Sequence, residues 1–459
     1  MQPADPPAGA APGVTPRSSR AIFLFWVPLA AQWLMMASEG PFLAAIIARL
    51  GDPTFNLAAY GVSFAVAILV ESPVIMLMSA STALVEDRES YVKLRNFTRA
   101  LNAGSTLLLL LLLIPPVFGF FAGTLLGLPA EVAGLVYGSL WILLPWPAAI
   151  GYRRFLHGLL IRAGRTRLVA YGTVLRIVGM AGTATALYLL TELPGAWVGA
   201  AALSAGVCVE AATAHVMALP VIRRLQHGAE LAPPEEGPRK VAAPPPERLN
   251  YREIARFYYP LALTSFIGLT VQPVLTFFMG RAASPVESLA VFPVVHALSF
   301  LFRALGLSYQ EAAIALLGKR AEHQPEVARF GMWLGLAAAG GLGLVAFTPL
   351  ADVWFITVSG LTPELAELAI VATRVIVIFP ALTVLLSYQR SILVIARRTA
   401  PVTMASALEV GTIALLFPLF GFLLGWVGVV AAVASFMAGR LVGTAYLLPK
   451  VRRALRGLG

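Results

Sequence analysis

The chain has 459 residues, of which 58% are hydrophobic and 12% are charged, whereas an ordinary soluble domain has roughly 25% charged residues. A soluble protein of this length could not bury so much apolar surface, so the composition predicts a polytopic membrane protein. The single cysteine, Cys208, excludes an internal disulfide and a cysteine-based metal site. The net charge of +11 is compatible with a nucleic-acid partner only if the basic residues gather on a soluble surface.

In chain order, the apolar segments predict about twelve transmembrane helices, since a bilayer requires roughly 20 apolar residues for each. We expect them near residues 21–48, 56–83, 97–125, 131–161, 166–191, 195–224, 252–280, 287–317, 325–350, 363–394, 401–424 and 426–448. The predicted fold class is all-α.

Three polar segments divide the chain into two lobes. Residues 1–20 form a Pro/Ala/Gly-rich tail that we expect to be disordered, and residues 227–250 form a polar, proline-rich cytoplasmic linker. The first lobe is then 21–226, the second lobe is 251–449, and a basic tail follows at 450–459.

The basic residues lie mainly on one side of the predicted membrane. With the N-terminus in the cytoplasm, most of the 34 Lys and Arg fall in cytoplasmic loops and helix ends, and only Arg49 and Arg281 face the other side. This positive-inside pattern predicts cytoplasmic N- and C-termini in a bacterial-type cytoplasmic (inner) membrane. The positive net charge is then explained by the orientation in the membrane and by contacts with anionic lipid headgroups. We therefore expect membrane lipid as a partner and no nucleic acid.

The two lobes repeat one pattern. The segment Phe25–Ala30 returns as Phe257–Ala262, an offset of 232 that also places Pro41 on Pro273. An even number of helices in each lobe means that both repeats enter the membrane from the same side, so they are parallel repeats. A duplicated apolar chain of this kind is typical of transporters with a central site.

The first predicted helix carries Gln32 and Glu39 on one face, directly followed by Gly40 and Pro41. Proline has no amide hydrogen and clashes with the preceding turn, so the helix should break beside Glu39. A carboxyl group at such a break can exchange protons, which makes Glu39 a candidate for proton coupling. The alternative is a protonated carboxyl group that only satisfies the kink.

Ionisable residues in the middle of spans cost at least ~2.5 kcal/mol and persist only when they are paired or face water. The repeat matches them with opposite charges: Glu71 with Arg303, Arg176 with Glu409, and Glu210 within one residue of the counterpart of Arg440. Two interpretations remain open. The residues are buried ion pairs within or between lobes, or they line a central cavity that binds substrate and a coupling proton.

The helical faces favour one interpretation for each set. Glu71 and Arg303 each share a face with polar or aromatic residues, so we expect Glu71 to serve in proton coupling and Arg303 to bind substrate. Arg374 has no charged counterpart and is a freer cation. The predicted substrate-binding residues are Arg303, Arg374, His296, Gln32, Tyr60, Gln272 and Ser299, although a lone histidine such as His296 is more often simply hydrogen-bonded. The predicted structural charge pairs involve Arg176, Glu409, Glu210 and Arg440.

Other features point away from catalysis. The sequence contains no P-loop, no HExxH motif and no nucleophile elbow, so we expect no enzyme activity, no cofactor and no metal. We expect a proton or sodium gradient to drive transport, and we expect the protein to be a monomer.

The adjacent Arg153 and Arg154 are expected to snorkel at a cytoplasmic helix end. Trp141, Pro145, Trp146 and Pro147 indicate an interrupted fourth span.

The overall pattern resembles the multidrug/oligosaccharidyl-lipid/polysaccharide exporter (MOP) superfamily, of which the multidrug and toxic compound extrusion (MATE) proteins are one branch. Pro28-Leu29, Glu39, Leu57–Gly61 and Ser72-Pro73 are more closely similar to the opening of the progressive ankylosis (ANKH) family. The superfamily resemblance covers the chain from Ala21 onward, whereas the branch residues cover only the first two spans. It implies two six-helix lobes in a V and alternating access in a cleft lined by spans one, two, seven and eight.

The expected function is secondary active export by alternating access. The ANKH-type resemblance implies anions such as citrate or phosphate-containing metabolites, and Arg303, Arg374 and His296 agree with an anionic ligand. Three alternatives remain: a proton-coupled MATE-type antiporter for cationic or amphiphilic drugs, a flippase for a lipid-linked headgroup, and a membrane scaffold that transports nothing.

Overall fold

The computed structural model describes residues 18–228, 231, 250–318, 320–396, 398 and 400–458. Within these ranges the chain is helical, with one isolated β-bridge between Ala283 and Val427. Ten helices are long and apolar enough to cross a membrane, or up to twelve if each of two bent helix pairs is one span. The all-α prediction with about twelve spans is confirmed. Most of the predicted tail 1–20 and linker 227–250 lies outside the described residues.

The helices preceding the linker are α1 (Ser19–Ala37), α2 (Glu39–Ile47), α3 (Pro53–Glu71), α4 (Leu77–Leu84), α5 (Arg88–Leu112), α6 (Pro115–Gly119), the π-helix η1 (Phe120–Leu125), α7 (Ala130–Ile142), α8 (Trp146–Arg162), α9 (Thr166–Leu190) and α10 (Gly195–Gln226). The interruption predicted near Pro145 separates α7 from α8.

The helices following the linker are α11 (Tyr251–Leu269), α12 (Val271–Met279), α13 (Pro285–Leu316), α14 (Gln324–Phe347), α15 (Leu350–Asp352), the π-helix η2 (Val353–Val358), α16 (Pro363–Val375), α17 (Phe379–Ile395), α18 (Ala400–Phe417), the π-helix η3 (Pro418–Leu423) and α19 (Gly428–Leu458). Because α19 runs on to Leu458, the predicted basic tail continues the last helix rather than forming a separate segment.

The break predicted beside Glu39 is present, and the second repeat has its counterpart. In the first repeat α1 ends at Ala37, because Pro41 has no amide hydrogen to donate to its carbonyl oxygen. In the second repeat α11 ends at Leu269 for the same reason, with Pro273 four residues later. Proline spacing therefore sets the same kink in both lobes.

The turns after these kinks also repeat. Asp52 and Ser284 both have φ 50°, a left-handed conformation, and each immediately precedes a proline that begins the next helix, Pro53 in α3 and Pro285 in α13. The two turns are 232 residues apart, the offset found in the sequence. The backbone thus supports the internal repeat.

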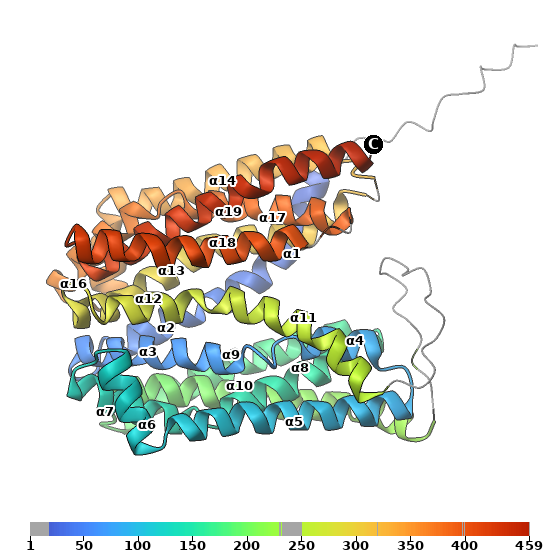
Figure 1. Cartoon of the computed structure of the whole chain (residues 1–459), viewed down its shortest axis with the longest axis horizontal. Helices are drawn as coiled ribbons and strands as arrows, with labels where there is room; N and C mark the ends of the chain where they lie inside the picture. Colours follow the sequence, from blue (N-terminus) through green and yellow to red (C-terminus); the bar gives the residue numbers. More distant parts are fainter. Residues whose placement is uncertain are drawn as a thin grey trace, which may run out of the picture.

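The helices form two bundles that lie side by side, one mainly from each repeat (Figure 1). The first helix of each repeat crosses to the other bundle. In α1, Trp26 Nε1 donates to Ser308 Oγ of α13 at 2.9 Å. In α11, Tyr258 donates to the carbonyl oxygen of Pro73 and packs edge-on against Phe97, with ring centroids 5.3 Å apart.

Helix α1 belongs to the predicted first lobe 21–226, yet one of its faces packs against the second repeat. Ile22, Trp26 and Ala30 are buried in an apolar cluster whose other members all belong to the second repeat, including Tyr309. The apolar side of this helix finds its partners in α13 and α14, so packing, rather than position along the chain, decides where α1 belongs.

The bundles meet at the end of the molecule that carries Arg49 and Arg281. Arg49 Nη2 donates to the carbonyl oxygens of Thr357 (2.6 Å) and Val358 (2.9 Å) at the end of η2. Its repeat counterpart Arg281 donates through Nη2 to the carbonyl oxygen of Thr124 in η1, at 2.5 Å. We call these reciprocal bonds the outer contact. Away from it, the bundles diverge toward the end where α19 finishes (Figure 1).

Candidate functional site

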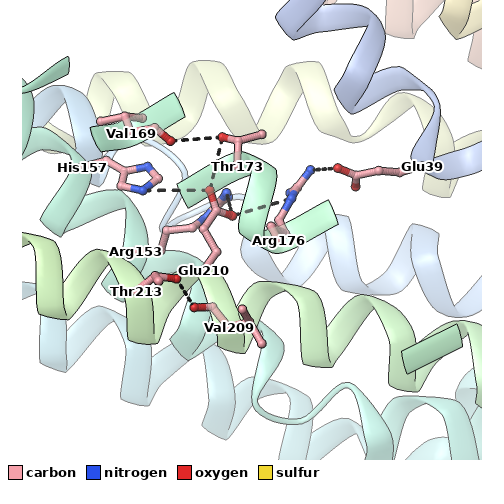
Figure 2. A network of polar contacts seen from close by, with 9 residues as sticks. All are labelled: Glu39, Arg153, His157, Val169, Thr173, Arg176, Val209, Glu210 and Thr213. Atoms are coloured by element: carbon pink, nitrogen blue, oxygen red, sulfur yellow. Dashed lines mark hydrogen bonds and ion pairs between the residues drawn. The ribbon is translucent and has the colours of Figure 1, made fainter. Parts of the chain in front are cut away.

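A buried polar network joins four helices of the first bundle (Figure 2). Its centre is Glu210 of α10, which is fully buried and forms an ion pair with Arg153 of α8. Arg176 Nε of α9 lies 3.6 Å from the Glu210 carboxylate, and His157 Nε2 lies 3.9 Å from it. Thr173 Oγ1 donates to the same carboxylate at 3.5 Å. Such a network persists in an apolar medium because each charge has a partner.

The network extends to the kink between α1 and α2. Arg176 also forms an ion pair with Glu39, at the first residue of α2 (Figure 2). Two carboxylates, Glu39 and Glu210, are thereby matched by two guanidinium groups, those of Arg153 and Arg176. The group is balanced in charge and ties the kink to α8, α9 and α10.

Glu71, the last residue of α3, lies outside the ion pairs of this network. Its carboxylate accepts a hydrogen bond of 2.6 Å from Trp146 Nε1, at the start of α8. The helix is interrupted after Glu71, where Pro73 follows, and resumes only at Leu77. Among the described residues, Glu71 forms no ion pair, although it is buried.

The second bundle carries an excess of positive charge. Arg440 of α19 is neutralised by Glu409 of α18, with Nη2 and Nε 2.8 and 3.1 Å from the same carboxylate oxygen. Arg303 of α13 forms no ion pair with any described residue. The two guanidinium groups lie against the ring of Phe379, at 4.7 Å for Arg303 and 4.8 Å for Arg440.

Polar atoms without partners gather beside Arg303. His296 Nε2 lies 3.5 Å from Arg303 Nη1, and the His296 ring is within 3.3 Å of Gln272 Nε2. The Arg303 Nε and Ser299 Oγ atoms are buried without a hydrogen-bond partner. His296 and Ser299 line a small cavity of about 10 Å³, with room for roughly one water molecule. A ligand that supplied acceptor atoms here would satisfy both.

The structure therefore brings together three of the predicted substrate-binding residues around Arg303: His296, Ser299 and Gln272. Arg374 does not join them. It lies on an exposed side of α16, where its Nε donates to the carbonyl oxygen of Ala346 at 3.0 Å.

The remaining two predicted ligands belong to the first repeat. Tyr60 is buried and stacks on Phe64, with ring centroids 6.1 Å apart. Gln32 is exposed on α1.

The matched charges pair inside bundles rather than across them. Arg176 lies with Glu39 and Glu210, and Glu409 lies with Arg440. Glu71 and Arg303 do not form a salt bridge with each other, because each hydrogen-bonds within its own bundle. Similar depth in the membrane did not bring repeat counterparts into contact.

The prediction that Arg153 snorkels is wrong. Arg153 is 7% exposed and paired with Glu210, and His157, one turn further along α8, is also buried. The sequence contained a usable signal, since Arg153, Arg154 and His157 all lie inside the predicted span 131–161. Trp146, the partner of Glu71, gave no such signal. Among the residues that the structure describes, no three His, Cys, Asp or Glu side chains converge as metal ligands.

The fold is similar to solved structures, although the sequence matches no protein-family model and no curated protein. A multidrug resistance MATE family transporter of the MOP superfamily, in an inward-facing conformation, shares 17% identity at a TM-score of 0.64, with 92% of this chain and 95% of that chain covered. The lipid II flippase MurJ, in an inward closed conformation, shares 12% identity at a TM-score of 0.69, with 95% of this chain and 90% of that chain covered.

A third similar structure is a MOP superfamily transporter from Pyrococcus furiosus, described as having a binding pocket of reverse polarity. It shares 16% identity at a TM-score of 0.59, with 95% of this chain and 96% of that chain covered. These likenesses extend over nearly the whole chain and show a MATE-like, twelve-helix fold. The ANKH-type branch has no counterpart among them.

Proposed function

We propose that this protein is a secondary transporter that moves a small organic anion across the cytoplasmic membrane by alternating access. The whole-chain likeness to a MATE family transporter and to MurJ supports transport. Two bundles that meet through reciprocal bonds at one end and diverge at the other have the form that alternating access requires. The positive-inside pattern supports cytoplasmic termini, and nothing in this mechanism needs more than one copy of the chain.

One observation carries the choice of an anion: Arg303 is a buried guanidinium group in the middle of a span, and it forms no ion pair with any residue that the structure describes. A buried, uncompensated charge is costly, and an anionic ligand would lower that cost. The planar guanidinium fork matches carboxylate and phosphate oxygens, and the unpartnered hydroxyl of Ser299 adds a donor. Because the cavity beside Arg303 has only about 10 Å³, binding requires movement of α13 or of the aromatic pair Phe379 and Phe436.

Glu71 is the first-lobe carboxyl group that we assign to proton exchange. Glu39 is held in an ion pair by Arg176, whereas Glu71 accepts a hydrogen bond from the neutral indole of Trp146 and forms no ion pair with a described residue. Glu71 also lies at an interrupted helix, where the chain can rearrange between states. In this scheme Glu39 and Arg176 keep the kink in place, and protonation of Glu71 accompanies movement of the anion at Arg303.

Flipping of a lipid-linked headgroup is the second candidate. The likeness to MurJ favours it, and a headgroup phosphate would use Arg303 in the same way as a soluble anion. Export of a cationic drug has less support, because Glu39 and Glu210 are already neutralised by arginines. The ANKH-type branch remains a prediction from the first two spans.

Binding of citrate to the purified protein tests the proposed site. A ligand at 100 times its Kd stabilises a protein by about 2.7 kcal/mol, so citrate should raise the melting temperature of the wild type. Arg303→Gln should abolish that rise. Arg374→Gln is the matched control, because it removes a guanidinium group of the same lobe away from the site, and it should leave the rise intact. Equal stabilisation of all three proteins would reject Arg303 as the anion ligand.

A further inference from the structure

A second cavity lies in the first bundle, apart from the charge networks described above. It has a volume of about 290 Å³, is lined by residues of α5, α8 and α10, and is open on the side where Arg99 and Arg223 are exposed. Its size is near the lower limit of small-molecule sites, which start at roughly 300 Å³. It is about thirty times larger than the cavity beside Arg303, and the proposed transport cycle does not use it.

Three arginines give this cavity its charge. Arg95 and Arg99 lie one turn apart on α5, and Arg223 faces them from α10. No acidic residue lines the cavity, and none of the three arginines forms an ion pair with a described residue. The positive charge is therefore available to a ligand.

Polar atoms without partners lie in the wall between these arginines. Thr98 is 1% exposed, and its hydroxyl has no hydrogen-bond partner; Arg95 Nε is also buried without one. A buried donor without a partner destabilises the protein, because it has lost its hydrogen bonds to water. Nearby, Tyr152 Oη and His215 Nδ1 are 2.6 Å apart and close the side of the cavity formed by α8 and α10. An oxyanion with several acceptor oxygens would satisfy both orphan donors together.

The rest of the wall is apolar and comes from Phe155, Leu156, Leu219 and Ile222. A ligand that fits both parts has an anionic head and an apolar body. The positive-inside pattern places this end of the bundle at the cytoplasmic leaflet, where basic pockets between helices recognise lipid headgroups.

The second bundle is built differently at the corresponding place. Tyr388, the repeat counterpart of Tyr152, accepts a hydrogen bond of 2.6 Å from Gln324 of α14 instead of contacting a histidine. On α14, which corresponds to α5, Arg329 is exposed. This arginine lies outside the cavity and can serve as a control for the loss of one cytoplasmic charge.

We propose that this cavity binds a phosphate group, held by Arg95, Arg99 and Arg223 with the Thr98 hydroxyl. The apolar wall favours the phosphate of an anionic phospholipid over a soluble phosphate compound, and both share the chemistry that the arginines recognise. The site is independent of the proposed transport substrate, because it lies within the first bundle and includes none of the residues around Arg303 or Glu71.

Native mass spectrometry of the delipidated protein in detergent tests the proposal. Phosphatidylglycerol and glycerol 3-phosphate are titrated separately, against the wild type, a double variant Arg95→Gln/Arg223→Gln, and the control Arg329→Gln. The wild type and the control should bind the ligand alike, and the double variant should bind it at least tenfold more weakly. Tight binding of the lipid alone identifies a headgroup site, and equal binding of glycerol 3-phosphate identifies a site for soluble phosphates.

Two results would overturn the proposal: neither ligand binds the wild type, or the double variant binds as the wild type does. A folding defect in the double variant is separated from lost binding by its melting temperature without ligand. A variant that melts early is replaced by Thr98→Val, which removes only the buried hydroxyl and should also weaken binding. Citrate should still raise the melting temperature of every variant, because Arg303 is unchanged in all of them. A negative result in the phosphate-binding experiment therefore leaves the transport proposal unaffected.

Discussion

Removing the two arginines of the outer contact should shift the protein toward a conformation open on that side. Arg49 contributes two hydrogen bonds between the bundles and Arg281 contributes one, all from a guanidinium group to a backbone carbonyl oxygen. At about 1 kcal/mol for each exposed bond, Arg49→Ala/Arg281→Ala should weaken the contact by about 3 kcal/mol. At 1.4 kcal/mol per factor of ten, the ratio of closed to open protein should fall roughly 100-fold.

The rate of thiol labelling can measure this change. Ala48 is buried in the outer contact beside Gly360, so a cysteine there reacts with an impermeant reagent only when the contact opens. The experiment uses Ala48→Cys in a Cys208→Ser background, with and without the two arginine substitutions. The labelling rate should rise roughly 100-fold with the open population.

Two controls make the result specific. A cysteine at Glu131, which is exposed on α7 at the same end of the molecule as the outer contact, should label at one rate in all variants. Arg88→Ala removes an exposed arginine far from the outer contact and should leave the labelling of Ala48→Cys unchanged. If the double arginine variant labels at the wild-type rate, the reciprocal bonds do not hold the bundles together, and the reasoning fails.

Three further outcomes follow from single contacts. Glu210→Gln leaves the buried Arg153 without its carboxylate and should destabilise the protein by about 3 kcal/mol, so an unchanged melting temperature in detergent would contradict the network. Asp87→Ala removes the capping box at the start of α5 and should cost about 1 kcal/mol. The hydrogen bond from the Ser90 amide lowers the pKa of Asp87, so its stabilisation is present above the ordinary pKa of 3.8 and is lost as the pH falls through the lower, folded pKa. The difference in melting temperature between wild type and Asp87→Ala should therefore shrink in acid and stay constant near neutral pH. Gly280→Ala would place a Cβ atom 2.3 Å from the carbonyl oxygen of Leu126 across the outer contact. This clash should increase the labelling rate of Ala48→Cys. A slower or unchanged labelling rate would show that the contact accommodates the methyl group.

The sequence predicted the helices and their breaks well because these depend on local chemistry. Hydropathy sets the length of a membrane helix, and a proline removes a hydrogen bond four residues earlier wherever it occurs. Pro41 therefore located the first kink, and the structure adds an equivalent kink at Pro273 and equivalent turns at Asp52 and Ser284, both at the offset of 232. None of these features requires knowledge of how the helices pack.

Packing between distant helices could not be predicted in the same way. Trp26 and Ser308 are 282 residues apart, and nothing in the apolar pattern of α1 indicates that it leaves its own bundle. The partners of the buried charges were missed for a related reason. The repeat gives the depth of Arg176 in the membrane but not its direction around α9, and that direction, toward Glu39 and Glu210, decides its ion pairs.

Arg153 was misplaced because a long basic side chain in the cytoplasmic half of a span often reaches the interface as a snorkelling anchor. Its guanidinium group is instead directed into the bundle, where the buried carboxylate of Glu210 compensates it. A charge that lies well inside a predicted span, as Arg153 does, is better treated as a member of a buried network until its partners are known.

Flux into proteoliposomes tests the anion site most directly. Labelled citrate and a cationic dye are compared under an imposed pH gradient, with the wild type, Arg303→Gln and Glu71→Gln. If Arg303 binds the anion and Glu71 exchanges the proton, the wild type carries citrate, Arg303→Gln loses citrate flux, and Glu71→Gln loses its dependence on the pH gradient. Dye flux that persists in Arg303→Gln, together with no citrate flux in the wild type, would contradict an anion transporter.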